Sequence, residues 1–541
     1  MQTNSSAVPR ASAQNETIFA GATVVAGANQ KPQTNWSVVV ARGLVVALGP
    51  ADAIRNAHPG ARVIDAAGTT ILPGLTDAHG HLYGLGQSLD TVGLFGTHSF
   101  DEVIARVRER ATTASPNEWI LGRGWDQNHW IGKAFPTSAP LDLAIPDHPV
   151  WLRRVDGHAG LANGAAMRAA GITAATPDPE GGRILRDAAG NPTGVFIDGA
   201  EVLIDRAVPA PSPALRKARV LAAAKTIAAN GLTEIHDAGA DEATIRAVRE
   251  LIDEKQFPIR VYTMLTDDAT LLDAYLTKPP IISYGERLTI RSVKMYADGA
   301  LGSRGAALLA PYSDEPGNSG LLVTRPEHIL DVAKRARAAG FQVNAHAIGD
   351  RGVRNVLDAY EQAGVTAANR FRIEHLQVVA PSDFARLARH GVIASMQPTH
   401  ATSDMGWAQD RLGADRIRGA YAWRTVLDSG ARLALGSDFP IEDVNPFFGI
   451  YSAVTRQDQS GQPTGGWYPS QKLTLAEAIR GFTSDAAYAA FEEGSRGTIE
   501  TGKLADLTIV VGNVYAMPQS ELFRTKVRYT VVGGEVVYEG R

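Results

Sequence analysis

The stretch Ile71-Leu-Pro-Gly-Leu-Thr-Asp-Ala-His-Gly-His-Leu82 determines the fold that we expect for this chain. An apolar run leads into Asp77, and His79 and His81 follow two positions apart. Side chains two apart on a β-strand point to the same side. Two imidazoles that leave a strand end in one direction are half of a metal site. A His-x-His pair also occurs without function on surfaces, but the preceding apolar strand and Pro-Gly favour metal binding.

Strands of this kind recur along the middle of the chain, and helix-like sequence follows each one. The eight predicted strands cover residues 70–76, 232–236, 259–264, 289–296, 342–346, 370–375, 392–397 and 432–436. Apolar strands that alternate with helices indicate a parallel sheet covered on both faces. Eight of them predict a TIM-like (β/α)8 barrel with its chemistry at the carboxyl ends of the strands. The polar residues at these ends are His79, His81, His236, Lys294, His346, His375, Gln397 and Asp438.

Both ends of the chain are rich in β-type sequence, and the first two barrel strands are far apart. We therefore predict a small β-sandwich from residues 17–70 and 495–541, after a disordered segment at 1–16. The barrel takes residues 71–83 and 229–494. Residues 84–228 form an inserted α/β subdomain with a hairpin across 182–197. Because the insert follows the first barrel strand, we expect it to lie over the barrel mouth as a substrate lid.

Composition excludes several classes of protein. The chain has 541 residues, 44% of them hydrophobic and 20% charged, with a net charge of −4 and no cysteine. We expect no nucleic-acid partner and no membrane partner, and any metal must use nitrogen and oxygen ligands. Residues 1–16 lack the apolar core of a signal peptide, which favours the cytoplasm; a leader removed before residue 1 would favour the periplasm or secretion. A homodimer would be common for this architecture.

Three later strand ends carry further metal-ligand candidates. His346 lies in Asn344-Ala-His-Ala-Ile-Gly-Asp350 and His375 in Arg372-Ile-Glu-His-Leu376. Taken alone, either histidine could be a hydrogen-bonded core residue or a metal ligand. Their shared position at the ends of barrel strands favours the metal site. Asp438, in Leu435-Gly-Ser-Asp-Phe-Pro440, is interpreted as a metal-bound carboxylate that also accepts the proton of the attacking water. The alternative for Asp438 is a helix cap.

Lys294, in Ser292-Val-Lys-Met-Tyr-Ala-Asp-Gly299, ends the fourth predicted strand. An unmodified lysine is a poor metal ligand because it is a cation at neutral pH. Two hypotheses remain open for it. Either Asp298 is its buried partner, or carbon dioxide has carbamylated Lys294 and converted it into a bridging carboxylate.

Other polar and aromatic residues are candidates for contact with a substrate. His236 and Asp237 fit hydrogen bonding behind the ligands better than metal binding. Arg304 either binds a carboxylate or carbonyl or forms an ion pair. Gln397, His400 and Trp407 follow the seventh strand and are expected in the pocket. From the insert, His158 has either a structural role or a substrate contact, and Trp125 and Trp130 either cover the pocket or belong to a core.

Taken together, these pieces resemble the amidohydrolase superfamily, in particular the amidohydrolase-3 branch that includes N-substituted formamide deformylases and YtcJ-like proteins. The resemblance covers nearly the whole chain. The matching segments are Leu72-Pro-Gly-Leu-Thr-Asp-Ala-His-Gly-His81, Arg123-Gly-Trp-Asp126, Val293-Lys-Met-Tyr-Ala-Asp-Gly-Ala-Leu-Gly-Ser-Arg304, His346-Ala-Ile-Gly-Asp350, Ile373-Glu-His375, Gln397-Pro-Thr-His400, Gly436-Ser-Asp-Phe-Pro440 and Gly502-Lys-Leu-Ala-Asp506.

The resemblance implies one or two divalent metals, zinc in most members. It implies that His79, His81 and Asp438 hold one metal, that His346 and His375 hold a second, and that carbamylated Lys294 bridges them.

The resemblance also implies hydrolysis of an amide-type C–N bond, in an N-acyl or N-formyl amine, by water that the metal activates. Hydrolysis of an ester, lactone or cyclic amide is an alternative for the same site. A regulatory metal-binding protein without catalysis is a third.

Overall fold

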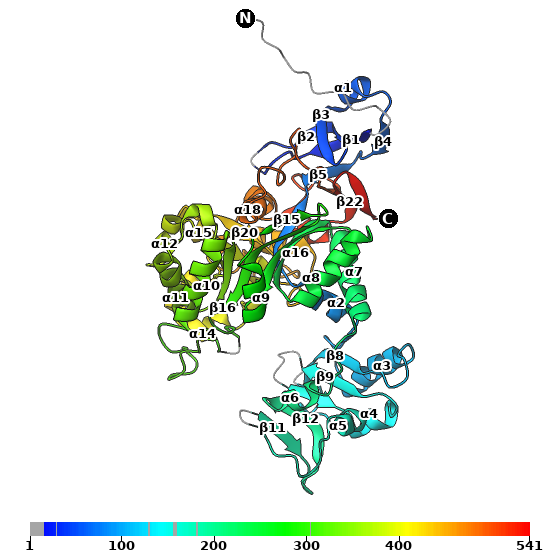
Figure 1. The fold of residues 1–541 in the computed structure, drawn as a ribbon, viewed down its shortest axis with the longest axis vertical. Helices are drawn as coiled ribbons and strands as arrows, with labels where there is room; N and C mark the ends of the chain where they lie inside the picture. The colour runs from blue at the N-terminus through cyan, green and yellow to red at the C-terminus, as the bar shows by residue number, and fades with distance from the viewer. Residues whose placement is uncertain are drawn as a thin grey trace, which may run out of the picture. The chain divides into compact units, whose positions relative to one another are not determined.

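The computed structural model describes residues 16–28, 30–127, 130–154, 159–179, 182–302 and 304–540. The segment predicted to be disordered lies outside the described residues except for Glu16, and so does His158. The chain divides into two compact units, one formed by Met1–Gly84 with Val220–Arg541 and the other by Leu85–Arg219 (Figure 1). No helix among the described residues combines the length and the apolar character needed to cross a membrane.

The first unit contains the predicted barrel. Its eight parallel strands follow the order β20-β19-β18-β17-β16-β14-β13-β6, and β15 pairs with β16 in antiparallel fashion. These strands are β6 Leu75–Gly80, β13 Leu232–Ala240, β14 Arg260–Thr266, β15 Ile281–Tyr284, β16 Leu288–Tyr296, β17 Gln342–Ala347, β18 Arg372–His375, β19 Ile393–Met396 and β20 Leu433–Leu435. The prediction of a TIM-like barrel is therefore confirmed.

Hydrogen bonds just beyond the last strand bring it to the first. Asp438 donates its backbone N–H to the carbonyl of His79 at 2.7 Å, and His81 donates to the carbonyl of Phe439 at 2.9 Å. The Asp77 carboxylate accepts the hydroxyl of Ser437 at 2.7 Å. A Cβ on Gly436 would lie 2.5 Å from an Asp77 oxygen, so only glycine permits this approach. The closure thus holds Asp438 beside the two histidines that follow Asp77.

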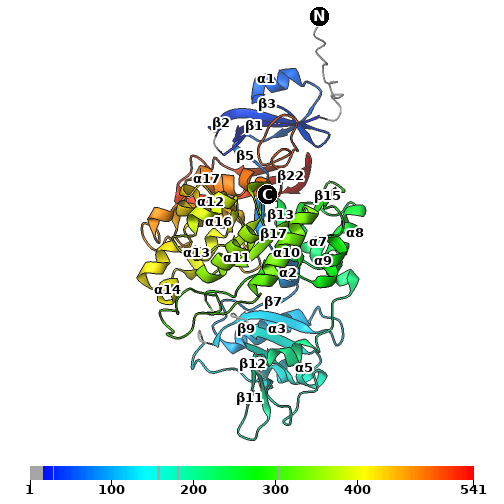
Figure 2. The ribbon, with the colours of Figure 1, turned by 60° about the vertical axis from the view of Figure 1, so that its left-hand side comes forward.

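Helices follow the strands and cover the outside of the barrel (Figure 2). In α8 Glu242–Asp253, Ile245, Val248 and Leu251 turn one apolar face inward, and Asp241 caps the helix by accepting from the N–H of Thr244 at 2.7 Å. The other helices of the barrel region are α2 Leu82–Leu89, α7 Pro213–Ala229, α9 Ala269–Tyr275, α10 Pro326–Ala339, α11 Asp350–Gln362, α12 Phe384–His390, α13 Pro398–Asp404, α14 Ala408–Arg416, α15 Trp423–Asp428, α16 Pro446–Thr455, α17 Leu475–Gly481 and α18 Ser484–Ala489.

The first predicted barrel strand, residues 70–76, requires a correction. Residues up to Pro73 form β5 Thr69–Pro73, which pairs with β21 Leu507–Val511 in the terminal sheet, and the barrel strand β6 begins at Leu75. The sequence run is continuous, but a Cβ on Gly74 would lie 2.3 Å from the Thr233 hydroxyl. Pro-Gly therefore separates two strands that enter different sheets, and His79 lies on the barrel strand itself.

Both chain termini contribute strands to one β-structure, as predicted, but these strands form one mixed sheet where a β-sandwich was expected. Its order is β23-β22-β21-β5-β1-β2-β3, with β4 paired to β1. Its apolar core combines Phe19, Val38 and Ile71 from the beginning of the chain with Leu507 and Val531 from its end. The remaining elements are β1 Glu16–Val24, β2 Gln33–Ala41, β3 Leu44–Pro50, α1 Ala51–Ala57, β4 Arg62–Asp65, β22 Val527–Val532 and β23 Glu535–Glu539.

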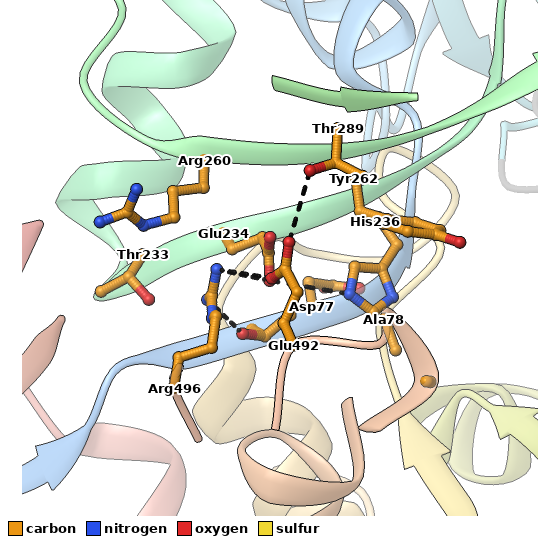
Figure 3. A network of polar contacts seen from close by, with 12 residues as sticks. Asp77, Ala78, Thr233, Glu234, His236, Arg260, Tyr262, Thr289, Glu492 and Arg496 are labelled. Atoms are coloured by element: carbon orange, nitrogen blue, oxygen red, sulfur yellow. Dashed lines mark hydrogen bonds and ion pairs between the residues drawn. The ribbon is translucent and has the colours of Figure 1, made fainter. Parts of the chain in front are cut away.

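Beneath the barrel, toward the amino-terminal ends of its strands, lies a buried polar cluster (Figure 3). Arg496 stands between Glu234, at 2.8 Å, and Glu492, at 3.3 Å. Arg260, at the start of β14, binds both carboxylate oxygens of Asp506 at 2.8 and 3.0 Å. We call these five residues the base cluster. Its charges are paired within the protein, so it is a structural joint between barrel and terminal sheet.

The second unit is a six-stranded sheet of order β11-β12-β10-β9-β8-β7 with helices packed on it. The predicted hairpin is confirmed as the antiparallel pair β11 Gly182–Arg186 and β12 Pro192–Asp198. Its role as a lid stays a prediction. The other elements are β7 Val92–Gly93, α3 Phe100–Ala111, β8 Ile120–Trp125, α4 Ala139–Ala144, β9 Val150–Arg154, β10 Ala159–Ala162, α5 Gly164–Ala169 and α6 Glu201–Asp205.

Candidate metal centre

Imidazoles from three barrel strands converge on one carboxylate at the strand ends. The ring centroids of His79 and His375 lie 4.7 Å apart, and those of His346 and His375 lie 4.6 Å apart. Asp438 Oδ1 lies 3.4 Å from His79 Nε2 and 2.9 Å from His81 Nε2. The structure thus brings together the four histidines and the aspartate that the sequence singled out.

The atoms of this cluster that face one another lack hydrogen-bond partners. His79 Nε2, His346 Nε2 and Asp438 Oδ1 are buried, and each is without a hydrogen bond in the described structure. Buried polar atoms are rarely left unsatisfied unless something else binds them. His79, His375 and Asp438 each offer a ligand atom, and these atoms lie within 4.8 Å of one another. Nitrogen and carboxylate oxygen are ligands that a divalent transition metal accepts, so the residues fit such an ion.

At His346, His375 and Asp438 the electrostatics favour the protonation states that a metal requires. Burial, together with the charge of Lys294, lowers the pKa of His346 to about 3. Burial and the neighbouring His346 lower the pKa of His375 well below its ordinary value. Burial works against ionisation of Asp438, but the neighbouring imidazoles of His79 and His81 hold its pKa well below the usual range. Neutral imidazoles and an anionic carboxylate are the forms that donate electron pairs to a metal.

Two side chains behind the cluster orient its histidines. Glu374 Oε2 lies 2.6 Å from His79 Nδ1, and Gln397 Oε1 lies 2.8 Å from His375 Nδ1. Each contact fixes one ring nitrogen and leaves Nε2 for the cluster. Burial and Lys294 lower the pKa of His79, but Glu374 and Asp438 outweigh them and raise it. Gln397, expected among substrate contacts, is therefore placed behind His375.

Two of the expected supporting residues contact other groups and not the cluster. Asp237 accepts the N–H of Leu82 at 2.9 Å, and burial raises its pKa to about 6. His236 Nδ1 lies 2.8 Å from the guanidinium of Arg372, on the side of the base cluster. Neither residue is among the converging ligand atoms.

Lys294 is 1% exposed and points toward the cluster. Its Nζ lies 4.4 Å from the ring centroid of Tyr296, and no ion pair or hydrogen bond of this amine is present among the described residues. Asp298, the expected partner, instead accepts backbone N–H groups of Ala307, Ile348 and Gly349 at 2.8 to 2.9 Å. Burial raises the pKa of Asp298 to about 7. The hypothesis of a Lys294–Asp298 pair is therefore not borne out by the structure.

A cavity of about 390 Å³ opens beside the cluster within the first unit. The expected pocket residues His400 and Trp407 line it. The His400 ring stacks on His375 with centroids 5.8 Å apart, and its Nε2 lies 3.6 Å from Asp438 Oδ2. The full lining is His81, Lys294, Tyr296, Ala300, Leu301, Gly302, His346, Ile348, His375, Gln377, His400, Asp404, Trp407, Asp438, Ile441 and Glu442.

Three residues considered for substrate contact lie elsewhere in the fold. Trp125 is fully buried in the core of the second unit, and its indole N–H donates to the carbonyl of Leu152 at 2.8 Å. A side chain so enclosed presents no surface to a substrate. Trp130 packs in the same core. Arg304 does not line the cavity; its guanidinium binds both carboxylate oxygens of Asp314 at 3.1 and 2.9 Å.

Sequence reasoning missed Glu374, Asp404 and Glu442. A signal for Glu374 existed, because Arg372 and Glu374 are two apart on a buried strand, and like-facing charges in a core need partners. Asp404 and Glu442 carried no signal, since each lies beyond a strand in a segment whose path only the tertiary structure gives.

The chain is similar to several known proteins over nearly its whole length. The pattern of the amidohydrolase family matches residues 62–538. YtcJ of Bacillus subtilis (strain 168) is 34% identical over 93% of this chain and 96% of that protein. N-substituted formamide deformylase of Arthrobacter pascens is 28% identical over 93% and 95%. The crystal structure of an uncharacterized metal-dependent hydrolase from Pyrococcus horikoshii OT3 matches with a TM-score of 0.79 and 27% identity, covering 93% of this chain and 99% of that one. The chain therefore belongs to the amidohydrolase family.

Proposed function

We propose that this amidohydrolase hydrolyses an amide-type C–N bond and releases an amine from an N-acyl or N-formyl amine. One observation carries the proposal: buried ligand atoms of His79, His346 and Asp438 without hydrogen-bond partners meet at the edge of a cavity. The likeness to N-substituted formamide deformylase supports the bond type.

The same residues would hold the metal. In this proposal His79, His81 and Asp438 would hold one divalent ion, for which zinc is the first choice, and His346 and His375 would hold a second. Lys294, buried beside them without an ion pair among the described residues, would as its carbamate supply a further oxygen ligand. A metal bound in such a site lowers the pKa of water to about 7 and polarises a carbonyl group.

Asp438 has the position to move the proton in the reaction. Its carboxylate lines the cavity and reaches toward His79 and His81 on one side and toward His400 on the other. Held ionised at neutral pH, it accepts a proton from the attacking water and passes that proton to the leaving nitrogen. His400 lies near enough to Asp438 to orient it, while Glu374 and Gln397 keep the histidines in place.

Release of amine from a panel of N-formyl, N-acetyl and N-aroyl amines tests the proposal. Zinc-loaded protein should release amine, and chelator-treated protein should not, with activity returning when zinc is added back. Release that a chelator does not affect would contradict a metal-dependent reaction. No release from any compound, with metal shown to be bound, would overturn amide hydrolysis and favour esters, lactones or cyclic amides as substrates.

A further inference from the structure

One wall of the cavity carries two carboxyl groups that the proposed mechanism does not use. Asp404 ends α13, Glu442 follows β20, and both line the cavity together with Trp407. Asp404 Oδ2 accepts hydrogen bonds from neutral groups, the Tyr421 hydroxyl at 2.7 Å and the Gln377 amide at 2.8 Å. No ion pair of either carboxyl is found within the part of the chain that the structure describes. This wall therefore presents two carboxyl groups to a ligand.

Basic groups near this wall have contacts of their own. The guanidinium of Arg411, 5.6 Å from the ring centroid of Trp407, pairs with Asp314, as does that of Arg304. His400 Nε2 lies 3.6 Å from Asp438 Oδ2, and His400 interacts electrostatically with Asp404 and Glu442 as well. Lys294 lies over the ring of Tyr296, beside the metal ligands. Partly buried carboxylates without a cation are costly, and a bound cation would remove that cost.

The cavity is a ligand site for reasons independent of these two carboxyls. His346 Nε2 and Asp438 Oδ1, both without hydrogen-bond partners, belong to residues that line it. Its volume of about 390 Å³ lies within the range of small-molecule sites.

We propose that Asp404 and Glu442 form a cation subsite, so that the preferred substrate is an N-acyl amine with a second, positively charged nitrogen. The inference rests on the proposed amide hydrolysis and adds the substrate class. The acyl group meets the metal ligands, the alkyl chain crosses the cavity beside Leu301 and Ile348, and the ammonium group lies between the two carboxylates. A substrate that carries a carboxylate would meet repulsion at the same wall.

A pair of substrates of equal size tests the subsite. N-formyl-1,4-diaminobutane carries a terminal ammonium group, and N-formylpentylamine carries a methyl group at the same position. A series of N-formyl diamines with different chain lengths determines which length places the ammonium group best at the two carboxyls. We expect kcat/KM of the zinc-loaded enzyme to be at least about tenfold higher for the ammonium member, mainly through KM, and this preference to shrink as salt is raised.

Two variants test whether Asp404 and Glu442 cause the preference for the ammonium substrate. Glu442→Gln and Asp404→Asn should each reduce the ammonium preference by about three- to tenfold and leave kcat/KM for N-formylpentylamine within about twofold of the wild type. Asp410→Asn is the matched control, because Asp410 is an exposed carboxyl on α14 that does not line the cavity. Equal loss for both substrates in Glu442→Gln and Asp404→Asn would show a structural role and overturn the subsite.

Binding measurements separate the subsite from the reaction. Calorimetry with the zinc-loaded Asp438→Asn protein, which should not turn over, compares the affinities of the two amides directly. If the ammonium member binds more tightly and Glu442→Gln abolishes this difference, the subsite is supported. That conclusion holds even if the wild type hydrolyses neither amide. Absence of hydrolysis would count against the proposed function and not against the subsite. Equal affinities of the two amides at every chain length would overturn the subsite.

Discussion

Two polar clusters lie at opposite ends of the same barrel strands, and they differ in how their charges are satisfied. In the base cluster, Arg260 binds Asp506 and Arg496 binds Glu234, each at 2.8 Å. At the carboxyl ends, His79, His346 and Asp438 have buried atoms without hydrogen-bond partners, and Lys294 has no ion pair among the described residues. The first pattern stabilises a joint between barrel and terminal sheet. The second pattern leaves ligand atoms available to a metal.

The comparison predicts that the two clusters fail in different ways. Removing a group from the strand ends should impair metal binding or turnover and leave folding largely intact. Removing a group from the base should lower the free energy of unfolding and leave the metal site unchanged in the protein that remains folded.

The largest effect is expected at Asp438. Asp438→Asn should lower kcat for the best amide by about 10³-fold or more, because the amide cannot accept the proton of the attacking water. The melting temperature should stay within a few degrees of the wild type. Steady-state kinetics and thermal denaturation measure the two quantities, with Asp410→Asn as the exposed control. A variant with near-normal turnover would remove Asp438 from the mechanism.

Arg260→Ala tests the base. Loss of the guanidinium leaves Asp506 buried without its partner, so the free energy of unfolding should fall by about 3–5 kcal/mol. Chemical denaturation measures this change, and metal content of the folded fraction should stay at the wild-type level. Arg524→Ala breaks an exposed pair with Glu521 and should cost less than about 1 kcal/mol. Equal stability losses in the two variants would contradict the assignment of the base as a structural joint.

Glu374→Gln tests a residue that contacts both a metal-ligand candidate and a buried arginine. The Glu374 carboxylate holds His79 at 2.6 Å, and Arg372 lies 4.0 Å from its other oxygen. We expect metal affinity to fall by about 10- to 100-fold, because an amide orients the imidazole less strongly. Competitive titration with a chelator measures the affinity, and Glu361→Gln, an exposed carboxyl, serves as the control. Unchanged affinity would show that Glu374 serves stability alone.

The most gradual effect concerns the pH dependence of stability. Burial, with the charge of Glu234, raises the pKa of Glu492 to about 8 from its ordinary 4.5. The folded protein therefore keeps a proton that the unfolded chain releases, and this stabilisation is complete below pH 4.5 and lost as pH rises toward 8. Glu492→Gln cannot ionise, so its unfolding free energy relative to the wild type should rise by about 1 kcal/mol for each pH unit across this interval. Denaturation curves at several pH values measure the trend.

The exposed carboxyl of Glu521 provides the control for that trend. Glu521→Gln should follow the wild type at every pH, since this side chain is 44% exposed. A difference between Glu492→Gln and the wild type that does not change with pH would show that Glu492 is not protonated in the folded protein.

The sequence alone was sufficient for the barrel, for the terminal sheet and for the ligand candidates. Apolar strands with period-two histidines at their ends indicate a buried parallel sheet, and residues at the carboxyl ends of such strands must meet at one rim. His79, His346, His375 and Asp438 converge for that reason.

The tertiary structure decided what depends on contacts between distant segments. The split at Pro73-Gly74 follows from the approach of Thr233, and the role of Gln397 follows from its distance to His375. Trp125 belongs to a core because the second unit closes around it. Asp404 and Glu442 line the same cavity although they are 38 positions apart in sequence, and no local sequence pattern predicts this proximity. Strand periodicity is a local property of the chain, whereas the neighbours of a side chain are fixed only when the whole fold packs.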